Sequence, residues 1–294
     1  MAESPSHKLG QIIGNLLEAI MHPLLSKFCA SHDLYLDFQG KKRSIRRGRK
    51  VTWIDGYGNK HDLDYVIEKN GRDDWQGDPI AFIEVAWRRY TKHSHNNAQE
   101  IQGAILPLAE KYHWANPFLG VVLAGEFTDG SIEQLRSLRF KVLHFPYDLL
   151  LQAFATEEVI LRFDESTSDQ EFQEAVDILQ AASPELLERV KQNLIAANQT
   201  EIQTFFKSLT ERVSRSVTRV VIIPLYGREN TFASIQGALE FLNAHPIYEG
   251  SGAFRKYEVY VTFSDGDRVQ AEFQSKQNAR EFLVLFASSI NPSS

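Results

Sequence analysis

The chain has 294 residues, which is long for one ordinary domain, so we expect one large or two modest domains. Apolar residues make up 43% and charged residues 24%, the composition of a globular protein with a full core. The formal net charge of −6 excludes a globally basic nucleic-acid binder, so such binding would require a local basic surface. The single cysteine, Cys29, excludes a disulfide framework and argues against a cysteine-based zinc site.

The sequence lacks the patterns of a membrane or secreted protein. No apolar run approaches the roughly 18 residues of a membrane-spanning helix, and the N-terminus does not show a charged-then-apolar signal pattern. We therefore expect a cytoplasmic protein with no membrane partner.

Residues 1–150 predict a layered α/β domain. Apolar residues recur at helical spacing from Leu9 to Ala30, and Pro23 is expected to kink or divide that helix. Alternation of strands and helices after a hairpin indicates parallel pairing at the end of the sheet. The elements expected after the first helix are a strand at 34–38, a hairpin of 51–55 with 61–68, a strand at 79–87, a helix at 96–113, a strand at 118–124, a helix at 129–138 and a strand at 141–146.

A basic segment at 41–50 carries seven cations and no acid. Two interpretations have equal weight: a solvated loop, or a loop that contacts phosphates, because it lies just upstream of acidic strands. The candidate nucleic-acid-binding residues here are Lys42, Arg43, Arg46, Arg47, Arg49 and Lys50.

Two carboxylates lie on neighbouring predicted strands. Asp64 leads the apolar run Tyr-Val-Ile, and Glu84 lies inside the apolar run 79–87, where an uncompensated carboxylate is costly. If the strands pair, both acids face one point and offer hard oxygen ligands that suit Mg²⁺ or Mn²⁺. Asp62, two residues earlier on the same strand face, is the alternative ligand to Asp64.

These acids and the element order resemble the PD-(D/E)xK nuclease superfamily. That family has a helix, a three-stranded meander, a helix and a further strand, with an acid opening the second strand and acid-x-lysine on the third. The matching residues are Asp64 and the run Glu84-Val85-Ala86, and the resemblance covers residues 8–150. It implies a restriction-endonuclease-like core with a metal ion held by Asp64, Glu84 and Val85. The supporting polar residues that it implies are Glu18 and Gln99.

One position departs from the family pattern. Ala86 stands where the family carries a lysine that helps activate the attacking water. Three explanations are open: another cation replaces the lysine, the domain is a degenerate binder that does not cleave, or the alanine is an engineered inactivating change. The candidate replacement cations are Lys92, Arg88 and Lys60.

A second group of cations follows the third strand of the predicted meander. We expect Arg88, Arg89 and Lys92 to hold phosphates. His93 and His95 have no further histidine or cysteine at ligand spacing, so phosphate contact is favoured over metal binding. Three tryptophans are expected to pack in the core or at its rim rather than to stack on bases: Trp53, Trp75 and Trp87.

The second half of the chain changes character. Residues 151–215 predict a helical connector, and residues 216–294 predict a small α+β domain of recognition or assembly type. The expected elements are helices at 147–155, 169–182 and 184–215, a strand at 218–226, a helix at 231–244, a hairpin at 257–273 that turns at Asp265-Gly266, and a helix at 276–288.

The function expected from these features is a Mg²⁺- or Mn²⁺-dependent DNA endonuclease of restriction or phage-defence type. The expected partners are double-stranded DNA, a second copy of the chain, and a companion methyltransferase or defence-complex subunit. One alternative is a non-catalytic DNA-binding subunit of a larger complex. A purely structural protein-interaction scaffold is the third interpretation.

Overall fold

The computed structural model describes residues 4–88, 94–161, 163, 167–225, 230–245 and 254–287. Contacts divide the chain into two compact units, Met1–Thr210 and Glu211–Ser294. The fold is mixed α/β, which confirms the predicted class. Within the described ranges, no helix is long and apolar enough to cross a bilayer.

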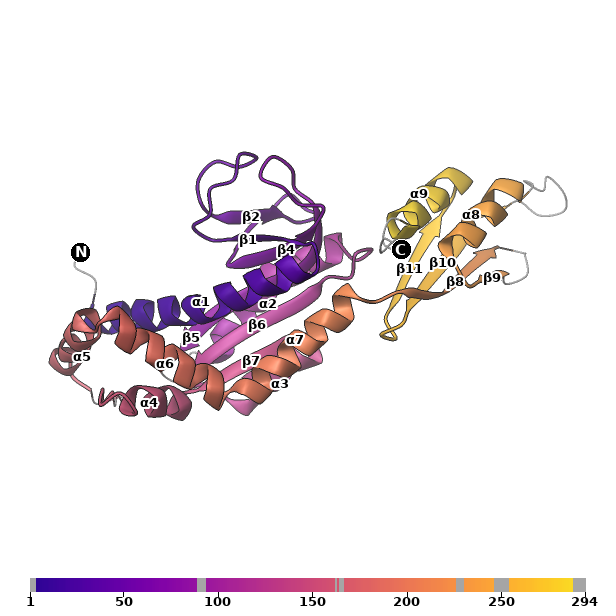
Figure 1. Cartoon of the computed structure of the whole chain (residues 1–294). Coiled ribbons are helices and arrows are strands. Elements are labelled where there is room, and N and C mark those ends of the chain that lie inside the picture. The colour runs from indigo at the N-terminus through magenta and orange to yellow at the C-terminus, as the bar shows by residue number, and fades with distance from the viewer. Residues whose placement is uncertain are drawn as a thin grey trace. The chain divides into compact units, whose positions relative to one another are not determined.

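A five-stranded mixed sheet forms the centre of the first unit, in the order β1-β4-β5-β6-β7 (Figure 1). Strands β1, β4 and β5 pair antiparallel, and β5, β6 and β7 pair parallel, as the sequence pattern predicts. The strands are β1 (Tyr35–Phe38), β4 (Tyr65–Lys69), β5 (Asp78–Arg88), β6 (Phe118–Gly125) and β7 (Lys141–Pro146).

Helices cover both faces of this sheet. On one face, α2 (Ser94–Lys111) and α3 (Asp129–Ser137) bury an apolar cluster with Phe82 and Leu119. On the other face lie α1 (Pro5–Ser31), α4 (Tyr147–Ala155) and α7 (Gln199–Val213). Phe118, whose side chain alternates with that of Leu119, meets Phe205 of α7 at 5.2 Å between ring centroids. The two-sided burial explains why β6 is apolar along its whole length.

The long first helix is continuous. Ser4 caps its N-terminus by accepting a hydrogen bond from the His7 amide, and Pro5 occupies the first turn, where no N–H is needed. The helix runs through Pro23, and α2 runs through Pro107 in the same way, so neither proline divides its helix.

The predicted connector does not form a separate layer. Helix α5 (Asp169–Ala181) packs on α1, and α6 (Pro184–Ala197) packs on α4, so residues 151–210 belong to the first unit. The single helix predicted at 184–215 is wrong, because α6 ends at Ala197 and Asn198 is its C-cap. The buried Asn198 amide donates to the His144 carbonyl oxygen at 2.8 Å, a tertiary contact that interrupts the helix.

The segment predicted as one strand at 61–68 is two strands. Strand β3 (Lys60–Leu63) pairs with β2 (Val51–Ile54) in a separate two-stranded sheet, and the chain then enters the central sheet as β4. Alternation in β3 buries only one face, whereas Tyr65, Val66 and Ile67 are all buried and need cover on both faces. Asp64 therefore lies at the point where the chain leaves one sheet for the other.

The second unit is a four-stranded antiparallel sheet in the order β11-β10-β8-β9. Alternate residues of β10 are buried, as a sheet with one covered face requires. The helix predicted from residue 231 begins later, because Asn230–Phe232 pairs with β8 instead. Its elements are β8 (Val217–Pro224), β9 (Asn230–Phe232), α8 (Ile235–Ala244), β10 (Tyr257–Phe263), β11 (Arg268–Phe273) and α9 (Lys276–Ala287).

Candidate functional site

The register of β4 against β5 places the two predicted acids opposite each other. Tyr65 pairs with Ile83, and in an antiparallel ladder the next pair outward is Asp64 with Glu84. The short-range sequence pattern placed both residues on strands, and the pairing brings their carboxyl groups together.

Asp64 also completes the hydrogen bonding of β5. Strand β4 begins at Tyr65, so among the described strands none pairs with this edge of β5 beyond Glu84. The Asp64 Oδ2 atom accepts a hydrogen bond from the backbone N–H of Val85 at 2.8 Å, which replaces the missing ladder partner. This bond fixes the orientation of the Asp64 carboxylate.

The environment of the pair raises the pKa of both carboxyl groups. Burial, the neighbouring Asp64 charge and a hydrogen bond to Asp64 raise the pKa of Glu84 to about 9. Burial likewise raises the pKa of Asp64, although its hydrogen bonds to Val85 and Glu84 oppose that shift. At neutral pH the carboxyl group of Glu84 therefore carries a proton.

A third acid lies close to this pair. Glu18, on α1, is half-buried, and its pKa is raised by burial and by the charge of Asp64. Glu18 and Asp64 line a cavity of about 270 Å³, together with Asn15, His22 and Gln39. Glu18 thus lies beside Asp64, and the supporting role that the family resemblance implies for it stays a prediction.

The residues present fit a hard divalent cation. Glu84 Oε1 is buried and has no hydrogen-bond partner among the described residues, so one carboxylate oxygen lacks the contact that a buried acceptor needs. The nearby donors are carboxylate oxygens, the ligands that Mg²⁺ and Mn²⁺ prefer. No cluster of three or more acidic, histidine or cysteine side chains at metal-binding distance occurs among the described residues. Any such ion would thus be held by Asp64 and Glu84 and completed by backbone, water or substrate oxygens.

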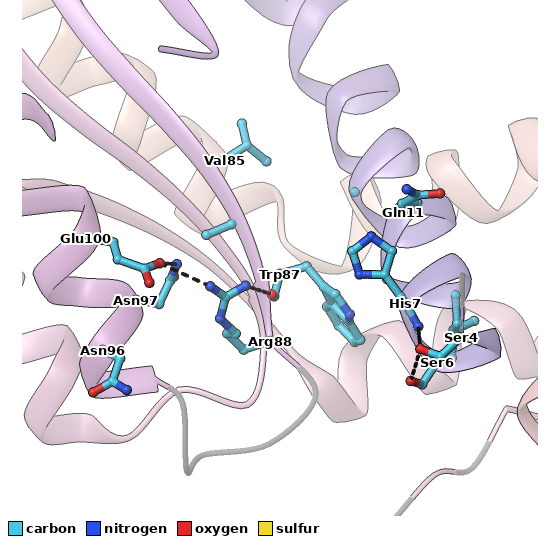
Figure 2. A pocket seen from close by; sticks show the side chains of 14 residues that line it. Ser4, Ser6, His7, Gln11, Val85, Trp87, Arg88, Asn96, Asn97 and Glu100 are labelled. Atoms are coloured by element: carbon cyan, nitrogen blue, oxygen red, sulfur yellow. Dashed lines mark hydrogen bonds and ion pairs between the residues drawn. The ribbon is translucent and has the colours of Figure 1, made fainter. Parts of the chain in front are cut away.

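Ala86 lies beside a larger cavity at the open edge of β5. It is 9% exposed and belongs to the apolar cluster under α2, and it also lines a cavity of about 700 Å³. This cavity lies between the start of α1, the end of β5 and the start of α2 (Figure 2). A longer side chain at residue 86 has space in this cavity.

Arg88 lies on the same face of β5 as Glu84 and Ala86, because alternate side chains of a strand share a face. Its guanidinium donates to the Trp87 carbonyl oxygen at 2.9 Å and meets Glu100 of α2 at 3.4 Å. Figure 2 shows Asn97 and Glu100 on one side of Arg88. The ion pair with Glu100 holds Arg88 toward α2.

The basic segment 41–50 contains two cations with structural partners. Arg43 is 4% exposed, and its guanidinium donates to Asp37, to both oxygens of Glu68 and to the carbonyl oxygens of Arg72 and Trp75, at 2.5–2.9 Å. All five N–H donors of an arginine are used in this way. The expectation that Arg43 contacts phosphate is therefore wrong. Arg46, which is largely buried, also pairs with Asp37.

The other cations of the segment face solvent. Lys50 pairs with Asp62 at 2.6 Å on the surface, whereas Lys42, Arg47 and Arg49 are exposed. The base of this loop touches the site, because the Gln39 amide donates to the Asp64 carbonyl oxygen at 2.9 Å. These exposed cations thus belong to a loop anchored at Asp64.

The remaining predicted residues lie elsewhere or outside the described part. Gln99 is exposed on α2, and Lys60 lies at the end of β3 away from Asp64. Asp62 is engaged by Lys50 and Thr52, which favours Asp64 as the ligand. Arg89, Lys92 and His93 lie outside the described residues, and so does the side chain of His95.

Sequence reasoning missed two residues. Asn97, at the start of α2, is 6% exposed and lines the larger cavity, and nothing in its sequence context distinguishes it from a surface asparagine. Trp75 is 60% exposed, unlike Trp53, which is buried against Phe82 as expected. The Gly and Asp residues around Trp75 were the available signal of an exposed turn.

Comparisons with known proteins add little. No protein-family model matches this chain. No curated protein sequence matches it at a significant level. Among solved structures, one described as "Crystal Structure of Protein of Unknown Function AF1548" is similar over 65% of this chain and 97% of that chain, with 12% identity and a TM-score of 0.27. A similarity at that level carries no argument, so the site rests on its own geometry.

Proposed function

We propose that the protein is a metal-dependent DNA endonuclease of restriction or phage-defence type with a restriction-endonuclease-like core. The observation that carries this proposal is the Asp64–Glu84 pair, in which one buried oxygen of Glu84 lacks a partner. A buried acid without compensation destabilises a fold, and a hydrophobic residue in its place would not. A divalent cation supplies the missing contact.

The chain's own residues would hold and orient the ion. Asp64 keeps one oxygen on the Val85 amide, and Glu84 gives up its proton when its carboxylate becomes a ligand. When bound, Mg²⁺ polarises a phosphoryl oxygen and lowers the pKa of a coordinated water. Glu18 adds negative charge beside Asp64 and so favours a cation there.

Lys42, Arg47 and Arg49 would hold the phosphates of the substrate. They are exposed on the loop whose base is hydrogen-bonded to Asp64, which suits backbone contacts near the scissile bond. A second copy of the chain and a companion methyltransferase or defence-complex subunit stay predictions.

The alternative is a DNA-binding subunit that does not cleave. Ala86 favours it, because the neutral methyl group offers no charge to the reacting water, and Arg88 is paired with Glu100. In this case Asp64 retains a structural use through Val85, and the exposed cations bind DNA without hydrolysis.

Incubation with supercoiled plasmid and Mg²⁺ tests the proposal. We expect cleavage that is lost in Asp64→Asn and in Glu84→Gln, two variants that keep the shape of the site. Asp62→Asn is the matched control, because Asp62 is exposed and pairs with Lys50. Cleavage that persists in both site variants contradicts the proposal. Salt-sensitive binding without cleavage, in the wild type and in Ala86→Lys, supports the alternative.

A further inference from the structure

The 700 Å³ cavity at the open edge of β5 has the size of a small-molecule site and a polar lining. Its walls come from three elements, with Gln11 and Gly14 from α1, Trp87 and Arg88 from β5, and Asn97 from α2 (Figure 2). The cavity continues along the strand that carries Glu84. Arg88, at its far end, is four residues or about 13 Å along the strand from Glu84.

Asn97 is the feature of this cavity that packing does not explain. Its side chain is 94% buried, given its 6% exposure, yet its Oδ1 has no hydrogen-bond partner among the described residues. Among the described residues, the amide nitrogen has one long contact, of 3.5 Å, to Glu100. A buried amide oxygen without a hydrogen-bond partner destabilises the fold, so a ligand that donates a hydrogen bond to it removes that cost and is bound more tightly.

The charge of the cavity argues for a neutral ligand group. The guanidinium of Arg88 is offset by Glu100 at 3.4 Å, so the part of the wall formed by described residues has little net charge to attract a phosphate. An amide that hydrogen-bonds, here that of Asn97, is a group with which proteins recognise the edge of a nucleobase.

We propose that this cavity receives one unpaired nucleobase of the nucleic-acid substrate and that Asn97 recognises its edge. This inference rests on the proposed function, because the cavity is lined by Val85, the residue that follows Glu84 on the strand that would hold the phosphate. A base enters such a cavity only when it is not paired in a duplex. The substrate class is therefore nucleic acid in which one nucleotide at the cut site is unpaired or is turned out of the double helix.

Two variants test the cavity without disturbing the metal pair. Gly14 lies inside α1 and lines the cavity, and a Cβ atom added at this position would meet no other atom within 4 Å, so Gly14→Phe is the variant chosen to fill the space. Gly103→Phe on α2 is the matched control, since Gly103 is exposed, equally uncrowded and outside the cavity lining. Asn97→Ala removes the amide, and its folded state is expected to be as stable as the wild type because the lost oxygen had no partner among the described residues.

Binding is measured in EDTA, by the anisotropy of a labelled single-stranded oligonucleotide and of the same strand with abasic sites. We expect the wild type to bind the complete strand about tenfold more tightly, and Gly14→Phe and Asn97→Ala to lose that difference. Gly103→Phe should keep it. Equal affinity of the wild type for both strands, or an unchanged difference in both cavity variants, overturns the inference.

These binding measurements and the plasmid cleavage assay together separate this inference from the proposed function. Base-dependent binding without Mg²⁺-dependent cleavage keeps the base site and contradicts the nuclease proposal. Cleavage that requires Asp64, with no preference for bases over abasic sites, keeps the nuclease proposal and contradicts the base site.

Discussion

Asp64 and Glu84 lie opposite each other one step beyond the last paired residues of β4 and β5, and the raised pKa of Glu84 keeps a proton on its carboxyl group at neutral pH. A metal ion must displace that proton, because only the deprotonated carboxylates are ligands. We therefore expect Mg²⁺ or Mn²⁺ binding to release a proton at neutral pH and to strengthen as the pH rises toward the Glu84 pKa of about 9. Calorimetry in two buffers of different ionisation enthalpy measures the release. A proton count of zero at pH 7 contradicts a protonated Glu84.

Without metal, Glu84 makes the protein less stable as the pH rises. The pKa of Glu84 is raised in the folded chain from its ordinary 4.5 to about 9. The contribution of Glu84 to the free energy of unfolding is therefore fully present below pH 4.5. It is lost as the pH increases to about 9, because Glu84 ionises at lower pH in the unfolded chain than in the folded one.

Glu84→Gln tests this pH dependence. The neutral amide of the variant does not ionise. In EDTA near pH 8, the free energy of unfolding should therefore be about 1–3 kcal/mol larger for the variant than for the wild type. Near pH 4 the two proteins should have the same free energy of unfolding. Urea denaturation at several pH values measures the difference. A variant that follows the wild-type curve across this range would show that Glu84 is ionised in the fold.

Ala86→Lys is expected to fold and to increase cleavage. The methyl group of Ala86 lines the 700 Å³ cavity, which has space for the longer side chain, and an ammonium group there could assist proton transfer at the reacting water. Such groups typically contribute about 10²–10⁴-fold to a rate. Single-turnover cleavage measures the gain, and Ala86→Met, similar in length but uncharged, is the control. Equal rates in the two variants would exclude a role for charge at this position.

Arg43→Ala should destabilise the protein strongly without being a phosphate-contact variant. The change leaves Glu68 and Asp37, which are 0% and 1% exposed, without their buried cation. Removing one partner of such a network costs about 3–5 kcal/mol. Thermal or urea unfolding measures it, and Arg43→Lys should recover little because one ammonium cannot supply five N–H donors. Wild-type stability in Arg43→Ala would show that the acids find other partners.

The exposed cations of the same loop should contribute to nucleic-acid binding and not to stability. Lys42→Ala, Arg47→Ala and Arg49→Ala each remove a charge for which the described residues offer no ion-pair partner, so stability should change little. If each contacts one phosphate, its loss lowers the slope of log affinity against log salt by about one unit. Titrations at several salt concentrations measure the slope, with Lys50→Ala as the control that already has a protein partner. Unchanged slopes in all three variants would remove this loop from the nucleic-acid interface.

The sequence predicted most elements of the first unit but not their partners. Periodicity gave β5, α2 and β6, because each is long and strongly patterned. It could not show that the segment around Asp64 changes sheets, since a strand's partner is set by contacts far away in the chain. The burial of Arg43 could not be predicted from the sequence for the same reason, because its partners Asp37 and Glu68 belong to two different strands.

The pairing of Asp64 with the Val85 amide bears on how substitutions in this site are interpreted. Asp64 is useful to the fold whether or not catalysis occurs, because its carboxylate closes the exposed end of a hydrogen-bond ladder. Glu84 Oε1 has no such second use among the described residues. In a chain that had lost its catalytic activity, substitutions would therefore be tolerated more readily at residue 84 than at residue 64. A glutamate kept at position 84 in related chains would therefore indicate selection for the function of the site, whereas an aspartate kept at position 64 would not.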